Sequence, residues 1–177
     1  MLPNSPLNAK VGILGGSFDP PHLGHTLLAL SALATTPIDE VWVMPCAAHA
    51  FQKPLTSFEH RIYMCEQAFS QLKNVHIVDI EQKLPTPNFT IATLEEISKL
   101  RPDLNLSLVM GSDLMDHFDT WEGADDIRKL AKLNIFDRKA LLPGAQSTQI
   151  RQAVKQQDFS HLDLKVRAYI QKHNLYA

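Results

Sequence analysis

The stretch of sequence that decides the fold runs from Gly15 to His25 and reads GGSFDPPHLGH. It follows a compact apolar run over residues 11–14, which is typical of a strand buried on both faces of a parallel sheet. Two glycines after a strand let the backbone turn tightly and approach a ligand with no side chain in the way. Pro20 and Pro21 fix φ and suit the start of a helix. The stretch therefore predicts a strand, a bare turn and a helix start in immediate succession.

Two histidines stand three residues apart at this predicted helix start. His22 and His25 would share one face of the first turn, with Gly24 keeping that face open. Imidazole rings can donate hydrogen bonds to a phosphate, and free N–H groups at a helix start favour the same anion. A solvated loop histidine and a zinc pair are the alternatives, but no third zinc ligand lies nearby. The sequence contains neither GxxxxGK[ST] nor GxGxxG, which excludes the two common glycine-rich phosphate motifs.

Outward from this stretch, apolar runs alternate with helical patterns along the whole chain. The further strands are expected at residues 41–44, 75–80, 104–110 and 133–136. Helices are expected over residues 22–35, 58–72, 91–100, 125–131, 148–157 and 162–173, with Thr56 and Glu59 as a capping box. This alternation predicts an α/β fold, a doubly wound and mostly parallel sheet with Rossmann-like topology. We expect a flexible N-terminal tail over residues 1–9 and a single domain over residues 10–177.

Composition limits the partners and the compartment. The 177 residues carry 17 Lys+Arg against 19 Asp+Glu, a net charge of -2, so no general basic surface for nucleic acid is expected. No apolar run approaches the roughly 20 residues that cross a bilayer, so no membrane partner is expected. Cys46 and Cys65 have no CxxC spacing, which favours free thiols in a reducing compartment. A cytoplasmic protein is the prediction.

The strand, the Gly-Gly turn and the HxGH pattern together resemble the signature of the HxGH nucleotidyltransferase superfamily. Further matches follow in order along nearly the whole chain and are similar to segments of the nicotinate-nucleotide adenylyltransferases. They are Lys53-Pro54 with residues 57–61 (SFEHR), residues 89–94 (FTIATL), Gly111 and Asp113 with Thr120-Trp121, Arg138 after a strand, and residues 147–151 (STQIR). Their number favours this family over the pantetheine-phosphate adenylyltransferases and the glycerol-phosphate cytidylyltransferases.

The resemblance implies adenylyl transfer from ATP to nicotinate mononucleotide, with pyrophosphate released and Mg²⁺ carried by the ATP phosphates rather than by a metal site in the protein. It implies catalytic roles for His22, His25, Lys53 and Arg151. It implies ATP contacts from Gly15, Gly16, Ser17, Phe18, His22, His25, Gly111, Asp113, Arg138, Ser147, Thr148 and Arg151. It implies contacts to the acceptor, a pyridine mononucleotide, from Lys53, Arg61, Thr90, Thr93 and Trp121. A homo-oligomer is left open.

Each of these residues also has a structural alternative. Lys53 could be a solvated lysine, and Arg61 could form an ion pair on its helix. Thr90 could be a helix N-cap, as could Asp113. Trp121 could stack on a pyridine ring or pack in the core.

Four departures from the family pattern leave the identity of the acceptor substrate undecided. Ser17 replaces a common threonine, Ala92 replaces an aspartate, Ala145-Gln146 replaces Ile-Ser, and residues 138–147 form an unusually short segment. The alternatives are therefore a related nucleotidyltransferase that uses nicotinamide mononucleotide or another phosphate acceptor, or a nucleotide-binding protein that has lost turnover. A coenzyme-binding oxidoreductase is disfavoured because the dinucleotide glycine fingerprint is absent.

Overall fold

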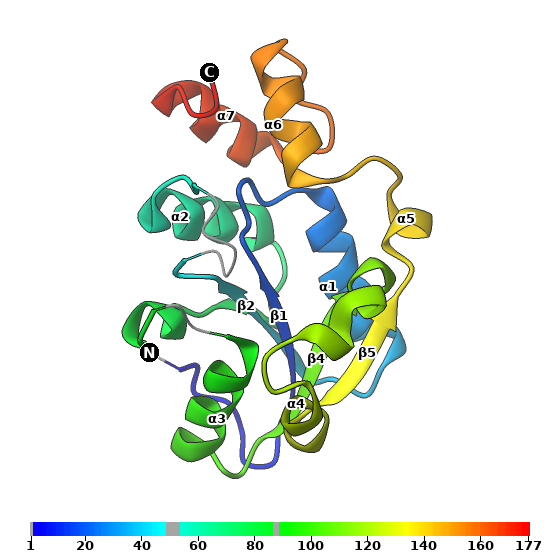
Figure 1. The fold of residues 1–177 in the computed structure, drawn as a ribbon. Coiled ribbons are helices and arrows are strands. Elements are labelled where there is room, and N and C mark those ends of the chain that lie inside the picture. The colour runs from blue at the N-terminus through cyan, green and yellow to red at the C-terminus, as the bar shows by residue number, and fades with distance from the viewer. Residues whose placement is uncertain (1, 49–53, 87–88) are drawn as a thin grey trace.

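A computed structural model describes residues 2–48, 54–86 and 89–177 (Figure 1). In this part of the chain the frame is a five-stranded, all-parallel sheet with the order β3-β2-β1-β4-β5. The strands are β1 (Lys10–Gly16), β2 (Glu40–Pro45), β3 (Val75–Ile77), β4 (Asn105–Gly111) and β5 (Lys132–Phe136). The strand order reverses between β1 and β4, so the carboxyl ends of these two strands form the switch point at which such sheets bind ligands.

Strand alternation sends apolar side chains to two different cores. Val11 and Ile13 pack against α3 (Thr90–Leu100), α4 (Ala124–Leu130) and the 3-10 segment η2 (Ser112–Thr120). Leu14, on the other face, packs against α1 (Leu23–Thr35) and α2 (Phe58–Phe69). Gly12 shares that second face, where a Cβ would lie 2.9 Å from both Ile38 Cδ1 and Val109 Cγ2. The missing side chain therefore lets the α1 side of the molecule approach the sheet closely.

The C-terminal helices form a separate apolar cluster on α2. After α5 (Arg138–Leu141), the helices α6 (Ser147–Lys155) and α7 (Leu164–His173) bury Ile150, Val166 and Ile170 against Met64 of α2. Figure 1 shows α6 and α7 at the end of the sheet where β1 leads into α1. The last part of the chain therefore lies beside the stretch from which the sequence analysis began.

The predicted fold class is confirmed, and two local expectations are wrong. The strand expected over residues 75–80 ends at Ile77 and is followed by the 3-10 segment η1 (Ile80–Lys83). The N-cap of α2 is Ser57 rather than Thr56, because the Ser57 hydroxyl accepts a hydrogen bond from the backbone N–H of His60. The N–H of Thr56 instead donates to the Asp19 carboxylate, at 3.3 Å.

The segment before β1 contacts the sheet through the carboxylate of Glu40. The Ser5 hydroxyl and the Trp42 indole N–H both donate to Glu40 Oε1, the second at 3.0 Å, while His76 Nε2 lies 3.1 Å from Oε2. Ser5 and Ala9 are themselves buried. The flexible tail over residues 1–9 stays a prediction, and these contacts show where that segment meets the domain.

Candidate active site

The turn between β1 and α1 is held in place by its backbone. Cys46 N–H, directly after β2, donates to the carbonyl of Gly16 at 2.9 Å. Phe18 has φ +48 and a fully buried ring that packs in the core beneath α1. Any contact between Phe18 and ATP would therefore come from its backbone. Gly15 is exposed, and a Cβ on it would meet no atom within 4 Å, so the space above this residue is open.

The two histidines of the signature lie together. Their ring centroids are 3.8 Å apart with an angle of 30° between the planes, and the His25 ring lies 4.7 Å from that of Phe18. The backbone N–H of His22, the N-cap of α1, donates to His25 Nδ1 at 3.2 Å. A ring nitrogen that accepts a hydrogen bond carries no proton, so neutral His25 carries its proton on Nε2. In the partly exposed His25, Nε2 is therefore the donor nitrogen, whereas His22 is only 1% exposed.

Two expectations about this helix start need correction. The first N–H groups of α1 are not simply free, because Leu23 N–H donates to the carbonyl of His161 at 2.8 Å. Gly24 does more than keep a face open, since a Cβ there would lie 3.0 Å from the His22 ring and 3.1 Å from Ala145 Cβ. The glycine is thus needed for the segment before α6 to pack against the histidines.

The STQIR motif of α6 directly contacts the turn over residues 17–22, between β1 and α1, which is called the signature turn below. Ser147 Oγ donates to the carbonyl of Pro20 at 3.0 Å, and Arg151 Nη1 donates to the carbonyl of Asp19 at 2.6 Å. A second nitrogen of Arg151 lies 3.2 Å from the hydroxyl of the exposed Thr148. The fold therefore brings Ser147, Thr148 and Arg151 to the turn that carries His22 and His25, as the resemblance implies.

Arg61 is buried beneath the site rather than exposed in it. It is 1% exposed, and its guanidinium donates to the backbone carbonyls of Thr56 (2.9 Å), Ser17 (2.9 Å), Cys46 (2.8 Å) and Ala47 (3.5 Å). These contacts tie the turn after β1 to the segment after β2 and to the start of α2. An acceptor contact for Arg61 stays a prediction, and the contacts described here are those of a residue that positions two loops.

The start of α3 carries the two threonines for which acceptor contacts are predicted. Thr90 is the first residue of α3 and partly exposed, while Phe89 is the N-cap. Thr93 is 3% exposed, and its hydroxyl donates to Glu81 Oε1 at 3.4 Å. The other oxygen of Glu81 accepts from Ala47 N–H at 3.3 Å. Sequence reasoning missed Glu81, whose only signal is its place in the segment that follows the third strand.

The remaining predicted residues surround the same end of the sheet. Gly111 ends β4 at the switch point, and Asp113 lies in the first turn of η2. Trp121 is half-buried and packs on Phe118, with ring centroids 5.2 Å apart, so packing accounts for part of its surface. Arg138 begins α5 directly after β5. Lys53 lies outside the described residues.

The sequence analysis gives no role to Asp19, although it lies within the turn that carries the two histidines. The residue is only 2% exposed, and its Oδ1 accepts a hydrogen bond from the hydroxyl of Tyr176 at 2.6 Å. The position of Asp19 within the signature was the available signal. Nothing local in the sequence points to Tyr176, which is 157 residues further along the chain.

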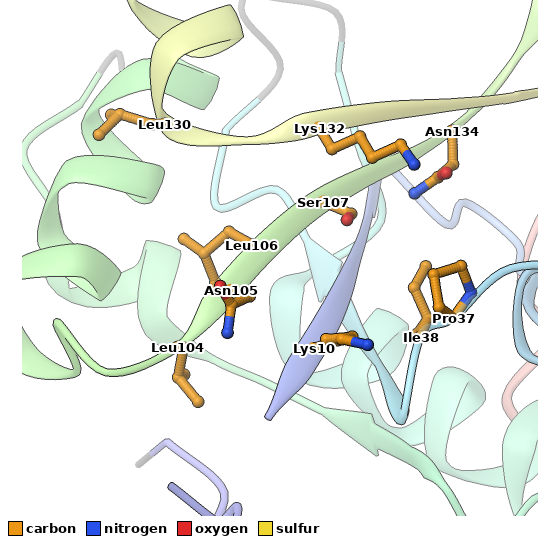
Figure 2. Close-up of a pocket in the computed structure, with 10 residues that line it drawn as sticks. All are labelled: Lys10, Pro37, Ile38, Leu104, Asn105, Leu106, Ser107, Leu130, Lys132 and Asn134. Atoms are coloured by element: carbon orange, nitrogen blue, oxygen red, sulfur yellow. The ribbon is translucent and has the colours of Figure 1, made fainter. Parts of the chain in front are cut away.

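A cavity of about 380 Å³ lies at the opposite end of the sheet (Figure 2). Lys10, Asn105 and Lys132 line it at the starts of β1, β4 and β5. None of the predicted site residues lines it. It is therefore separate from the candidate active site, which lies where the strands end.

Across residues 2–48, 54–86 and 89–177, no group of three or more His, Cys, Asp or Glu side chains is placed to hold a metal ion. A magnesium ion bound to ATP needs no such group, because it keeps phosphate and water oxygens as most of its ligands. In the same part of the chain, no helix is both long enough and apolar enough to span a bilayer.

The geometry of a β1–turn–α1 unit with paired histidines at the switch point defines a class of protein. The sequence model of the cytidylyltransferase-like family matches residues 13–163, so the chain belongs to this family. A protein of Anaeromyxobacter dehalogenans named as a probable nicotinate-nucleotide adenylyltransferase is 34% identical over 180 residues, which cover 94% of this chain and 96% of that protein. Within the wider class, the chain is thus a nucleotidyltransferase of the nicotinate-nucleotide adenylyltransferase family.

Solved structures agree with this assignment. A Vibrio parahaemolyticus protein named as a nicotinate-nucleotide adenylyltransferase superposes with a TM-score of 0.76 at 25% identity, covering 95% of each chain. The nicotinic acid mononucleotide adenylyltransferase of Plasmodium falciparum, solved in complex with NaAD, superposes with a TM-score of 0.77. It covers 95% of this chain and 97% of its own, and at 20% identity the likeness concerns the fold alone.

Proposed function

We propose that this protein transfers the adenylyl group of ATP to nicotinate mononucleotide, which gives nicotinate adenine dinucleotide and pyrophosphate. The observation that carries the proposal is the stacked pair of His22 and His25 at the switch point of the sheet. The relative from Anaeromyxobacter dehalogenans supports this choice of acceptor through its name.

In the reaction, an oxygen of the acceptor's phosphate attacks the α-phosphorus of ATP. One P–O bond forms, and the bond from the α-phosphorus to the oxygen that bridges to the β-phosphorus breaks, so pyrophosphate leaves with that oxygen and its electron pair. No covalent intermediate with the protein is needed. The work of the protein is to align two anions and to stabilise the charge on the transferring group.

The residues divide into donors to phosphate and residues that hold those donors in place. His25 donates from Nε2 to an oxygen of the ATP phosphates, and Lys53 and Arg151 complete the cationic and hydrogen-bonding surface. The buried His22 acts in catalysis through its stacked contact with His25. The bare backbone from Gly15 to Ser17 lets the triphosphate lie close to β1. ATP enters as its magnesium complex, and the metal neutralises part of the phosphate charge.

The adenosine and the acceptor occupy the two sides of the switch point. Gly111 and Asp113 receive the ribose of ATP, and Arg138 of α5 with Ser147 and Thr148 of α6 complete the contacts to ATP. Thr90, Thr93, Arg61 and Trp121 lie around the acceptor, and the half-buried Trp121 offers a ring edge or face to the pyridine. Since the contacts of Arg61 and Thr93 are with the protein itself, we propose that both act on the acceptor by positioning the loops around it.

A pyrophosphate-release assay tests the function directly. The purified protein is given ATP with nicotinate mononucleotide, ATP with nicotinamide mononucleotide, and CTP with each acceptor. We expect turnover with ATP and nicotinate mononucleotide to exceed turnover with every other pair. Faster turnover with nicotinamide mononucleotide would assign the protein to a different acceptor. ATP binding by calorimetry without pyrophosphate release would instead indicate a protein that has lost turnover.

We also propose a cytoplasmic location, which the two free cysteines support because unpaired thiols are typical of reducing compartments. Fractionation of cells that express the protein tests it, with recovery in the soluble cytoplasmic fraction as the expected result.

A further inference from the structure

The carboxyl group of Asp19 is a buried polar group in the middle of the turn between β1 and α1. Only 2% of the residue is exposed, and its two oxygens point to different parts of the chain. Oδ1 accepts from the Tyr176 hydroxyl at 2.6 Å, and Oδ2 accepts from the Thr56 N–H at the longer distance of 3.3 Å. A buried carboxylate that loses a short hydrogen bond must find another donor or move toward water. Of these two hydrogen bonds to the Asp19 carboxyl group, the one from the Tyr176 hydroxyl is therefore the shorter.

The chain is shaped to bring Tyr176 to this position. α7 ends at His173, and Asn174 follows as its C-cap in the left-handed conformation, with φ +50. Tyr176 itself has φ +65, a conformation that non-glycine residues adopt only when surrounding contacts hold it. Leu175 and Tyr176 pack on the apolar cluster of α2, α6 and α7. The packing of residues 174–176 therefore holds the Tyr176 hydroxyl beside Asp19.

Tyr176 remains a donor over the working pH range. Burial, and then the hydrogen bond and charge of Asp19, raise the pKa of Tyr176 well above its ordinary value. The phenol therefore stays protonated and remains the donor in its hydrogen bond to Asp19.

We propose that Tyr176 is a positioning residue for the nucleotide-binding turn, because its hydroxyl fixes Asp19 and through it the turn that leads to His22 and His25. The inference rests on the proposed function, since it assigns that turn to ATP. Two structural steps connect the residues. Asp19 and Pro20 shortly precede the N-cap histidine, with Pro21 between, and their carbonyls accept hydrogen bonds from Arg151 and Ser147 of α6. When the carboxylate moves, these carbonyls move with it.

The test compares Tyr176→Phe with Tyr169→Phe. Both variants keep the aromatic ring and remove one hydroxyl, and the hydroxyl of Tyr169 is hydrogen-bonded to His60 Nδ1 at 2.8 Å, away from the turn. For each variant we would measure kcat, KM for ATP, the thermal midpoint, and amide hydrogen exchange of peptides that cover residues 15–26.

For Tyr176→Phe we expect KM for ATP to rise about five- to tenfold, because the competent turn is less populated. Exchange in residues 15–26 should rise with it, while exchange in β4 stays at the wild-type rate. A smaller folded fraction would lower the apparent kcat and leave KM unchanged, so the rise in KM separates positioning from stability. Tyr169→Phe should keep the wild-type KM and the wild-type exchange of the turn.

Wild-type KM and wild-type exchange of the turn in Tyr176→Phe would overturn the proposal, as would the same rise in Tyr169→Phe. The exchange measurement does not need turnover, so failure of the proposed reaction in the wild-type protein leaves this test intact. If Tyr176→Phe does not fold, Tyr176→Met replaces it, since methionine keeps an apolar side chain in the cluster of α2, α6 and α7 and also removes the hydroxyl. Faster exchange of the turn would then support the proposal, and an unchanged rate would overturn it.

Discussion

At the scale of single residues, one nitrogen of the His25 ring has a structural partner, and the other is the donor that we propose for phosphate. Nδ1 accepts the backbone N–H of His22 and closes the first turn of α1, and this contact determines that Nε2 carries the proton of the neutral ring. The stacked contact with His22 and the tilted contact with Phe18 hold the ring plane. A donor held in this way needs little rearrangement when charge develops on a phosphate.

Replacing His25 by alanine should therefore lower kcat by roughly 10²–10³, the usual effect of removing one donor to a developing oxyanion. The pyrophosphate-release assay measures it. His117→Ala is the control, because His117 is exposed on η2 and the resemblance gives it no role. Undiminished kcat in His25→Ala would remove this histidine from the chemistry.

Arg61 should contribute to stability more than a surface arginine does. Lysine cannot reproduce a planar fork that reaches four carbonyls, so Arg61→Lys should lower the free energy of unfolding by about 2–4 kcal/mol. Urea denaturation measures the change. Arg167→Lys is the matched control, because that exposed guanidinium lies over the Phe159 ring at 4.9 Å and should cost well under about 1 kcal/mol. Equal effects of the two substitutions would show that the contacts of Arg61 are not stabilising.

The sequence motifs predict which residues lie near one another, and what those residues bind stays a prediction. The signature turn and the STQIR motif were expected together, and they lie in contact. Arg61 and Thr93 were expected to face a ligand, and both are buried and bonded to the protein. A motif gives the residue type and its place in the chain, but the direction of a side chain depends on packing that a linear pattern does not contain.

At the scale of elements, Gly123 and Gly15 both lack a side chain where one would matter, but for different reasons. Gly123 is the N-cap of α4 with φ +68, and a Cβ on it would lie 3.0 Å from Cβ of Ile91 in α3. Gly15, by contrast, has open space above it. The first glycine serves the packing of α3 on α4, and the second serves access to β1.

Gly123→Ala should lower the free energy of unfolding by about 2–3 kcal/mol, because it combines a strained φ with a contact to a rigid Cβ atom. Gly15→Ala should leave the free energy of unfolding within about 0.5 kcal/mol of wild type and weaken ATP binding, because the added methyl occupies the space proposed for phosphate. Thermal unfolding and calorimetry measure the two effects. An unchanged ATP affinity in Gly15→Ala would move the nucleotide away from this turn.

The elements themselves were predicted well where their periodic pattern is long. Helices α3 and α7 begin and end within two residues of their expected limits. The third strand is the exception, because the apolar run over residues 75–80 continues past the last β3 pair with β2, at Ile77, into a 3-10 turn. Apolar character alone does not mark where pairing with a neighbouring strand ends.

At the scale of the whole molecule, the reactivity of the buried Cys65 thiol depends on unfolding of the domain. Cys65 is fully buried between α2 and the sheet, and burial raises its pKa well above the ordinary value. Burial also raises the pKa of Cys46, with the nearby charge of Arg61 acting in the opposite direction. Because the thiolate is the reactive form, a raised pKa lowers the reactive fraction at any given pH below it.

We therefore expect a thiol reagent at pH 8 to label Cys46 more slowly than a free cysteine, and to label Cys65 only as fast as the whole domain unfolds. The labelling rate of Cys46 should keep rising above the pH at which a free thiol is already fully ionised. Mass spectrometry of the labelled peptides measures both rates, with the protein in urea as the control. Labelling of native Cys65 at the rate found in urea would contradict the burial described here.

The topology of the molecule follows from the alternation of its elements, whereas the position of its C-terminal helices does not. A right-handed series of β–α units leads to the order β3-β2-β1-β4-β5 with few alternatives. The packing of α6 and α7 on α2 depends on side-chain contacts between distant segments. For this reason the hydrogen bond from Tyr176 to Asp19 could be found only in three dimensions.

The contacts of Arg61 have a consequence for how such a protein can diverge. The hydrogen bonds that this guanidinium donates to residues 17, 46, 47 and 56 all end on main-chain oxygens, so these bonds place no demand on which amino acids occupy those positions. Descendant sequences can exchange the groups that line the rim of the site while the frame beneath them keeps its shape. A preference for a new acceptor can then evolve by a few rim substitutions, without a compensating change in the framework.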